Sequence, residues 1–311
     1  MHPAPSIVLF TTLSGVGYGL LFLLGLAAPF GQLPGDPAFG TVALGLALGL
    51  CAAGLLSSLA HLRHPERAWR AISQWRSSWL SREGLAALLT FLPAAVLGWG
   101  WIFEGRIIVA AAIVSALGAA ATVYCTARIY ATLQPIRQWR HPAVTTLYLL
   151  YALASGAVLL VLLLLLWDWR AQEAAFLAAF ATAAAWLIKL RYWRDIDGGR
   201  SIATPESATG LGHLGSVRLL EPPHTEENYL LKEMGFRVAR RHAERLRRLA
   251  AGSGFLLPVA SLIVIIASAG WWELPLAALA AIGVLLGTLV ERWLFFAEAT
   301  HTVILYYGRQ A

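Results

Sequence analysis

The sequence has few charged residues for its length, and this shortage excludes most soluble folds. Asp, Glu, Lys and Arg make up 13% of its 311 residues, whereas 58% are hydrophobic. A soluble domain carries about 25% charged residues, so most of this chain is expected to face something other than water. The formal net charge of +7 is compatible with binding to nucleic acid. However, the basic residues lie between long apolar runs, which favours orientation in a membrane over nucleic-acid binding.

Cysteine is scarce as well. The two cysteines, Cys51 and Cys125, each lie inside an apolar run, and no C-x-x-C motif occurs. Iron–sulfur clusters, c-type haem and zinc fingers all need clustered cysteines, so this chain is not expected to ligate any of them. We expect no disulfide bond.

Eight apolar runs are long enough to cross a bilayer, which takes about 20 apolar residues. The N-terminus lacks the basic region of a signal peptide, so the first run is expected to remain in the protein as a helix. We predict an all-α integral membrane protein in which 1–311 form one membrane domain. The predicted spans are 7–28, 41–61, 84–103, 107–129, 144–166, 172–192, 253–271 and 274–297.

Lysine and arginine are distributed very unevenly between the two sides of this predicted bundle. One side holds the basic residues that follow the second, fourth and sixth runs and those near the C-terminus, whereas the other side holds only Arg106 and Arg170. Cytoplasmic loops carry such an excess of basic residues. We therefore expect both termini to be cytoplasmic and the protein to lie in the inner (cytoplasmic) membrane.

One long polar segment, 193–250, separates the sixth and seventh runs and is expected to form a cytoplasmic loop. Residues 201–223 are rich in Gly, Pro and Ser and are expected to be extended, whereas 226–250 has the spacing of an amphipathic helix with arginines crowded into its second half. Such a basic helix rests on anionic membrane lipids or docks a soluble partner. The sequence leaves both alternatives open.

His61 stands where an apolar stretch ends and a run of arginines begins, with Arg63 and Arg67 following closely. A histidine titrates near physiological pH, so a neutral ring at the membrane edge can take the proton that a quinol releases on oxidation. The two guanidinium groups would stabilise negative charge on the quinone oxygens. The simpler alternatives are an interfacial histidine bonded to a backbone carbonyl and ordinary positive-inside arginines.

Glu83 and Arg128 lie at the same membrane edge and are candidates for the same site. Glu83 opens the third run and is the candidate proton acceptor opposite His61, although carboxylates at such positions commonly complement the helix dipole. Arg128 closes the fourth run, where it either flanks the quinone pocket or reaches the lipid headgroups.

Glu298 and His301 follow the eighth run. Glu291 and Glu298 are two helical turns apart on one face, and this helix is expected to continue as far as residue 306 or 307. Glu298 and His301 are therefore further candidates for contact with the quinone.

Two other functions compete with a quinone site. Paired histidines can ligate haem b, and His61, His141 and His301 fall on one side. However, none lies in the middle of an apolar run, where the ligands of a helix bundle project inward. Secondary transporters place broken helices and polar groups near the midplane, whereas the polar residues here lie at the cytoplasmic edge.

Several motifs together carry a family resemblance, although none is as specific as a metal signature. They are MHPAPS at 1–6, TTLSG at 11–15, SLAHL at 58–62, PERA at 65–68, SRE at 81–83, ARIY at 127–130 with Trp139, TPESATG at 204–210 and EPPHTEENY at 221–229. Over essentially its whole length the chain resembles the DmsC-type membrane anchors of the dimethyl sulfoxide reductase family of molybdenum oxidoreductases.

The resemblance implies an anchor without bound metal or haem that holds two soluble subunits on the membrane. These are a four-cluster ferredoxin-like iron–sulfur subunit and a molybdopterin catalytic subunit. It also implies transfer of two electrons between these clusters and the quinone pool, ubiquinone or menaquinone. The family's quinone-site histidine falls on His61 through the motif S-x-x-H-L, and its acidic residue after the loop falls on Glu83.

The long polar segment 193–250 departs from the best-known members, in which it is shorter. The block 204–229 resembles members attached to cytoplasmic sulfite-oxidising complexes. The resemblance therefore implies sulfite oxidation, with sulfoxide reduction as the alternative.

Overall fold

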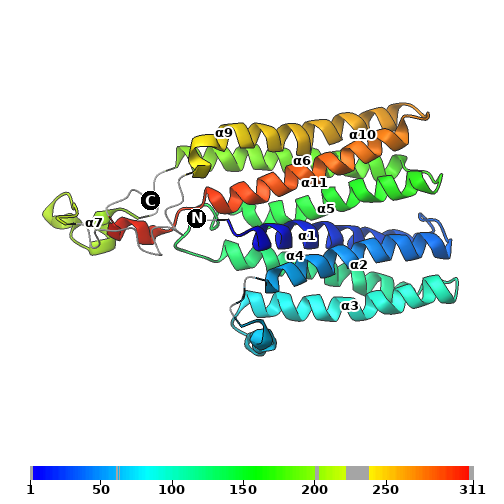
Figure 1. Cartoon of the computed structure of the whole chain (residues 1–311), viewed down its shortest axis with the longest axis horizontal. Helices are drawn as coiled ribbons and strands as arrows, with labels where there is room; N and C mark the ends of the chain where they lie inside the picture. Colours follow the sequence, from blue (N-terminus) through cyan, green and yellow to red (C-terminus); the bar gives the residue numbers. More distant parts are fainter. Residues whose placement is uncertain (1–2, 61, 63, 200–202, 222–237, 308–311) are drawn as a thin grey trace.

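The computed structural model describes residues 3–60, 62, 64–199, 203–221 and 238–307. Eight helices in this part of the chain are long and apolar enough to cross a membrane, and they form one bundle (Figure 1). Each predicted run corresponds to one of them, and the described residues contain no β-strand. The predicted all-α integral membrane fold with eight spans is therefore confirmed.

The helices begin and end close to the predicted runs. The first half of the bundle contains α1 (Pro5–Ala27) with the short turn η1 (Ala28–Phe30), α2 (Pro37–Leu59), α3 (Trp79–Phe103) and α4 (Val109–Ala131). The second half contains α5 (Ala143–Leu166), α6 (Gln172–Gly198), α9 (Val238–Ala251), η4 (Gly252–Leu256), α10 (Leu257–Ala267) and α11 (Glu273–Ala297). Outside the spans lie η2 (Pro65–Gln74), α7 (Pro205–Thr209), η3 (Gly212–Leu214) and η5 (Thr302–Tyr307).

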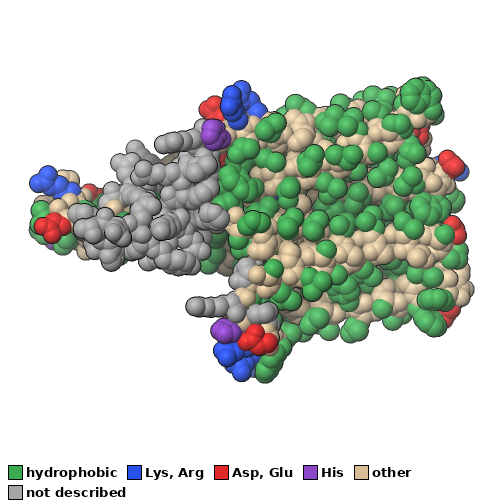
Figure 2. Space-filling model, viewed as in Figure 1, with side chains coloured by type: hydrophobic (Ala, Val, Ile, Leu, Met, Phe, Trp, Pro, Cys, Tyr) green, Lys and Arg blue, Asp and Glu red, His purple; other side chains and the backbone are tan. Residues whose placement is uncertain are grey.

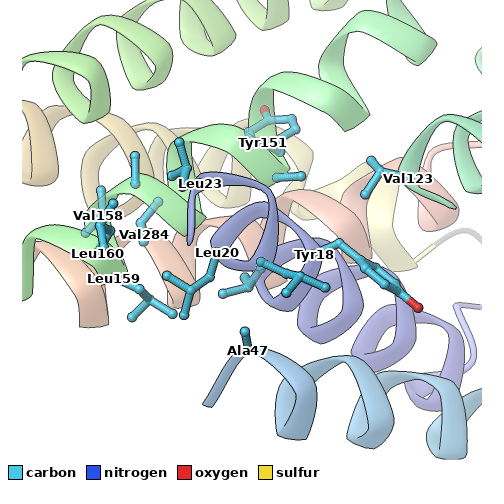
Figure 3. Close-up of a cluster of buried hydrophobic side chains, with 14 of the residues drawn as sticks. Tyr18, Leu20, Leu23, Ala47, Val123, Tyr151, Val158, Leu159, Leu160 and Val284 are labelled. Carbon is cyan, nitrogen blue, oxygen red and sulfur yellow. The ribbon is translucent and has the colours of Figure 1, made fainter. Parts of the chain in front are cut away.

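Helices α1 and α5 form the centre of the bundle. α1 packs against α2, α4, α5 and α11, and α5 also packs against α6. Figure 3 shows Tyr18 and Leu20 of α1 in this core, with Tyr151 and Val158 of α5 nearby. Because the outer helices have no protein on their far side, they expose large apolar side chains, and hydrophobic side chains dominate the flank of the bundle (Figure 2). This flank suits a lipid environment.

Glycine permits the close crossing of α1 and α5. A Cβ atom at Gly19 would overlap the carbonyl group of Ala152, and one at Gly156 would overlap the backbone of Gly19. Small residues at such crossings are how membrane helices gain close van der Waals contact, since lipid provides no hydrophobic drive between helices.

The bundle has two distinct ends. α1 begins and α11 ends at the same end, which we name the terminal end (Figure 1). The short connections 31–36, 104–108, 167–171 and 268–272 lie at the opposite end, which we name the hairpin end. The candidate residues Glu83, Arg128 and Glu298 all belong to the terminal end, because they lie near the start of α3 or the ends of α4 and α11.

Two element boundaries differ from the sequence prediction on either side of the long polar segment. α6 continues to Gly198, six residues beyond the predicted span 172–192, so the beginning of the predicted loop is helical. α9 runs through the π-turn η4 into α10 without a break, so the second half of the predicted basic helix is continuous with the seventh span. Residues 222–237 lie outside the described residues.

The prediction of a helix continuing to residue 306 or 307 was wrong. α11 ends at Ala297, and the chain then passes alongside the connection between α4 and α5. The backbone N–H of Thr302 donates to the carbonyl of Pro135 at 3.0 Å, and His301 pairs with Ile136. Through these contacts the backbone groups after Ala297 form hydrogen bonds with a different segment of the chain. The α-helix therefore does not continue.

Candidate functional site

Glu83 is a buried carboxylate near the membrane edge. It lies in the second turn of α3, and only 4% of its surface is exposed. Because α3 and α4 are antiparallel neighbours, the start of α3 meets the end of α4, and the hydroxyl of Thr126 on α4 donates a hydrogen bond to Glu83 Oε1. A buried carboxylate needs such a partner, and an ionisable residue inside a membrane helix indicates a functional site.

The Thr126 hydroxyl has one proton and two acceptors within reach. Its second acceptor is the carbonyl of Thr122, at 3.0 Å. If Glu83 is ionised, it takes the bond from Thr126. If Glu83 is protonated, it can donate to the Thr126 oxygen, and Thr126 can then donate to Thr122. The pair therefore retains a hydrogen bond in both protonation states, as a group that exchanges protons requires.

Two guanidinium groups lie over the indole ring of Trp79, which is four residues before Glu83 on α3. The Arg82 guanidinium lies 4.4 Å from the ring centroid, and that of Arg128 lies 5.3 Å from it. Arg82 also donates to the carbonyls of Trp75 and Arg76, at 2.9 and 2.6 Å, which fixes the end of η2 against α3. The structure therefore brings Arg128 at the end of α4 against the first turn of α3, together with a second cation.

The loop that carries the predicted histidine is described only in part. His61 and Arg63 lie outside the described residues, so their positions stay predictions. Arg67 lies on η2, which packs against α3, and its exposed side chain has Nε 3.7 Å from Glu66 Oε1. That distance makes a solvent-exposed ion pair, which contributes little to stability and leaves Arg67 free to turn toward an anionic ligand.

Glu298 belongs to a different cluster at the same end. Arg247 Nε donates to Glu298 Oε1 at 2.9 Å, and the Arg247 guanidinium also binds both carboxylate oxygens of Asp197, at 2.6 and 3.0 Å. Burial raises the pKa of Glu298, and the Arg247 charge opposes that shift. This cluster joins α6, α9 and the end of α11.

His301 lies close to Glu298 in sequence but has its own partners. Its Nδ1 accepts the backbone N–H of Val303 at 3.0 Å, so this nitrogen carries no proton. Burial lowers the pKa of the His301 ring. Among the described residues, neither Glu298 nor His301 forms a hydrogen bond with Glu83 or Arg128. Contact of Glu298 and His301 with a quinone therefore stays a proposal.

A buried ion triad in the second half of the bundle was not predicted from the sequence. Lys189 Nζ on α6 lies 2.5 Å from Glu291 Oε1 on α11, and Arg292 Nη2 lies 2.5 Å from Glu291 Oε2. One carboxylate thus balances two cations, leaving one positive charge in the interior. A lone lysine within the sixth apolar run was the available signal, since charges inside membrane spans are costly and normally paired.

A small polar cavity lies between Glu83's partner and this triad. Its volume is about 20 Å³, enough for one water molecule, and both Thr126 and Arg292 line it. The hydroxyls of Thr12 and Tyr151, which also line it, have no hydrogen-bond partner among the described residues. The cavity therefore places polar side chains between Thr126 on α4 and Arg292 on α11.

This bundle of eight long apolar helices, with apolar side chains on its flanks, defines a multi-pass integral membrane protein. A family model described as the DMSO reductase anchor subunit (DmsC) matches residues 1–298, and the chain belongs to this family. It is also 30% identical to a sulfite dehydrogenase subunit of Allochromatium vinosum (strain ATCC 17899), with 99% of each chain covered. The resemblance inferred from the motifs is confirmed, and the chain is a membrane anchor subunit of a molybdoenzyme complex.

Proposed function

We propose that this chain passes electrons between the quinone pool and the iron–sulfur subunit of a molybdopterin enzyme that it holds on the inner (cytoplasmic) membrane. The quinone, ubiquinone or menaquinone, is the exchangeable substrate. The observation that carries this proposal is the buried Glu83 carboxylate, hydrogen-bonded to Thr126 at the membrane edge. A lipid-soluble redox carrier would approach this end of the bundle from the bilayer.

Reduction of a quinone takes up two protons with two electrons, so the site needs groups that exchange protons. Glu83 would exchange one proton, because its bond to Thr126 can be formed in both protonation states. His61 would exchange the other, as its position in the motif S-x-x-H-L implies. Arg128, held beside Trp79, would stabilise negative charge on the quinone oxygens, together with Arg63 and Arg67.

The direction of electron flow is proposed from the similarity to a sulfite dehydrogenase subunit. In that direction the molybdopterin subunit oxidises sulfite and water to sulfate, releasing two protons and two electrons. The electrons pass through a four-cluster iron–sulfur subunit to the quinone, which takes up two protons and becomes the quinol. Sulfoxide reduction would run the same path in reverse and is the alternative.

The terminal end is proposed to face the cytoplasm and to receive the two soluble subunits. The excess of lysine and arginine in the connections at this end supports that orientation, because only Arg106 and Arg170 lie at the hairpin end. The site of Glu83 would then lie on the same side as the iron–sulfur clusters, so electrons would not need to cross the full thickness of the membrane.

The test uses the assembled complex and two electron acceptors. Sulfite-dependent reduction of a short-chain ubiquinone analogue reports on the membrane site, whereas reduction of ferricyanide reports on the soluble subunits alone. We expect Glu83→Gln to lower the first rate by about 100-fold, the scale of losing one general acid–base group, without changing the second. His61→Ala is expected to abolish the first rate while leaving the complex assembled.

The partner residue Thr126 offers a matched pair of variants. Thr126→Ser keeps the hydroxyl that bonds Glu83 and should retain quinone reduction, whereas Thr126→Val removes it and should lower the rate by about tenfold. Normal quinone reduction by the Glu83→Gln complex would refute the role of Glu83. Sulfoxide-dependent oxidation of a quinol analogue, with no sulfite activity toward either acceptor, would refute the proposed direction.

A further inference from the structure

A second cavity lies at the hairpin end, far from Glu83. It has a volume of about 1070 Å³ and is formed by the end of α1, η1, the end of α5 and the beginning of α6. This volume is slightly above the range for pockets that bind small molecules, about 300–1,000 Å³. The cavity is therefore large enough for part of an amphipathic ligand.

The deep part of this cavity is apolar. Leu23, Leu160 and Leu164 line it and are buried in the bundle, whereas Leu26 and Leu177 line it nearer the flank, with 39% and 37% of their surfaces exposed. The apolar lining therefore continues into the lipid-facing surface. A hydrocarbon chain could enter it sideways from the bilayer without passing through water.

The rim of the cavity carries charges of both signs. Asp168, Arg170 and Glu173 line it on the turn between α5 and α6 and on the first turn of α6. All three are exposed, and none of them forms an ion pair within the described part of the chain. A cation with a carboxylate on either side along the chain complements a headgroup that carries both a phosphate and an ammonium.

Hydrogen bonds hold this rim in place. Trp169 Nε1 donates to the carbonyl of Gln32 at 3.1 Å, and Trp167 Nε1 donates to Asp36 Oδ2 at 3.0 Å. The backbone N–H of Ala38 and the Trp167 indole lower the pKa of Asp36, so it stays an ionised acceptor. Asp168 itself has φ of 50°, a conformation that non-glycine residues seldom adopt and that fixes the turn.

We propose that this cavity binds a phospholipid whose headgroup carries a primary ammonium, in the leaflet at the hairpin end. Arg170 binds the phosphate, Asp168 and Glu173 bind the ammonium, and one acyl chain lies along the leucines. A quinone fits this cavity less well, because its neutral ring would leave the charges of Asp168, Arg170 and Glu173 without partners. The proposal does not depend on the quinone site.

The experiment measures which lipid the protein retains. The full-length chain, with any subunits that copurify, is reconstituted in nanodiscs of equal phosphatidylethanolamine, phosphatidylcholine and phosphatidylglycerol with matched acyl chains, then released and studied by native mass spectrometry. We expect phosphatidylethanolamine to be retained about fivefold over each of the others. Arg170→Ala should remove most of this preference. A fivefold preference is about the size expected from one interfacial ion pair, and this substitution removes the cation of that pair.

Three further variants separate a specific site from a general surface effect. Asp168→Asn with Glu173→Gln should shift the retained lipid toward phosphatidylglycerol, because the rim then holds only a cation. Ala174→Trp should reduce retention of all three lipids by filling the cavity, which Ala174 lines. Arg106→Ala is the matched control, because Arg106 lies at the same end but pairs with Glu104 at 2.5 Å, away from the cavity.

Two results would overturn the proposal. One is equal retention of the three lipids by the unaltered protein, which would indicate a non-selective lipid surface. The other is retention of phosphatidylethanolamine that survives Arg170→Ala and the acidic double variant. Because Asp168, Arg170 and Glu173 are exposed, these substitutions should leave the thermal unfolding of the protein unchanged.

Discussion

Lys189 and Glu291 form an ion pair in the interior of the bundle, with Nζ 2.5 Å from Oε1 and exposed fractions of 1% and 0%. Arg292 binds the other carboxylate oxygen, so the two cations share one anion. The aromatic rings of Tyr192 and Tyr148 lie 4.1 and 4.3 Å from the Lys189 ammonium and the Arg292 guanidinium. These ring faces add cation–π attraction to the pairing that makes buried charge tolerable.

The three members of this triad should differ sharply in their effect on stability. Glu291→Ala leaves two buried cations without their anion, and such uncompensated charge costs about 3–5 kcal/mol of unfolding free energy. Lys189→Met leaves the neutral pair of Glu291 with Arg292 and should cost about 1 kcal/mol or less. Thermal unfolding of both variants in the same detergent measures the difference. Equal losses for the two variants would contradict the charge argument.

The spans could be predicted from the sequence because each needs only a local run of apolar residues. The site could be predicted only in part. Glu83 was identifiable as a carboxylate at a membrane edge, but its partner Thr126 lies 43 residues away, and their contact depends on how α3 packs on α4. The ion pair of Lys189 could not be predicted for the same reason, because its anion Glu291 lies on a distant helix.

Helix ends were the least predictable part of the fold. The spacing of Glu291 and Glu298 indicated one continuous helix, but the backbone after Ala297 finds partners in 135–138, a segment far away in the chain. Gln138 Oε1 accepts the backbone N–H of Thr300 at 3.2 Å, for example. A pattern read along one segment contains no information about such long-range partners.

The crossing of α1 and α5 predicts opposite effects for two glycine substitutions. Gly19→Ala places a methyl group against the Ala152 carbonyl, so the helices must separate, and overpacking of this kind costs about 1–3 kcal/mol. Gly45→Ala on α2 is the matched control, because a Cβ there meets nothing within 4 Å. It should be neutral or stabilise the helix by up to about 1 kcal/mol. Thermal unfolding that ranks the two variants in the reverse order would refute the close crossing.

The burial of His301 predicts that the folded protein loses stability in acid. Its pKa in the folded protein is lowered by burial, so the unfolded chain binds a proton at a pH where the folded protein does not. The stability associated with neutral His301 is therefore complete above the unfolded pKa, about 6.5, and is lost as the pH falls through the folded pKa. Glu298 acts in the opposite sense, because burial raises its pKa and its contribution is lost as the pH rises through that value.

The variant His301→Asn isolates this effect. Asparagine does not titrate, and its Oδ1 can still accept the backbone N–H of Val303 that His301 Nδ1 now accepts. Between about pH 7 and pH 5, the melting temperature of the unaltered protein should fall more than that of His301→Asn. Parallel melting curves for the two proteins over this range would show that His301 does not titrate in the folded state as burial predicts.

Deletion of 204–229 is expected to release the soluble subunits from the membrane. In its described part, 204–221, none of the residues of α7 or η3 is buried, and α7 lies beyond the terminal end of the bundle (Figure 1). Glu206 instead holds this part together, accepting the backbone N–H of Val217 at 3.0 Å. A small ordered structure that contributes little to the bundle core is suited to docking a partner.

The deletion should therefore leave the melting temperature of the bundle unchanged while washed membranes lose the iron–sulfur and molybdopterin subunits. A milder variant, Glu206→Ala, removes the bond to Val217 and should weaken retention of the subunits without abolishing it. If 193–250 serves only to bind lipid, membranes with the deletion would keep both subunits at full occupancy. In that case the subunits must dock on the remaining terminal-end surface, formed by 132–142 and 298–307, whose hydrogen bonds join α4, α5 and α11.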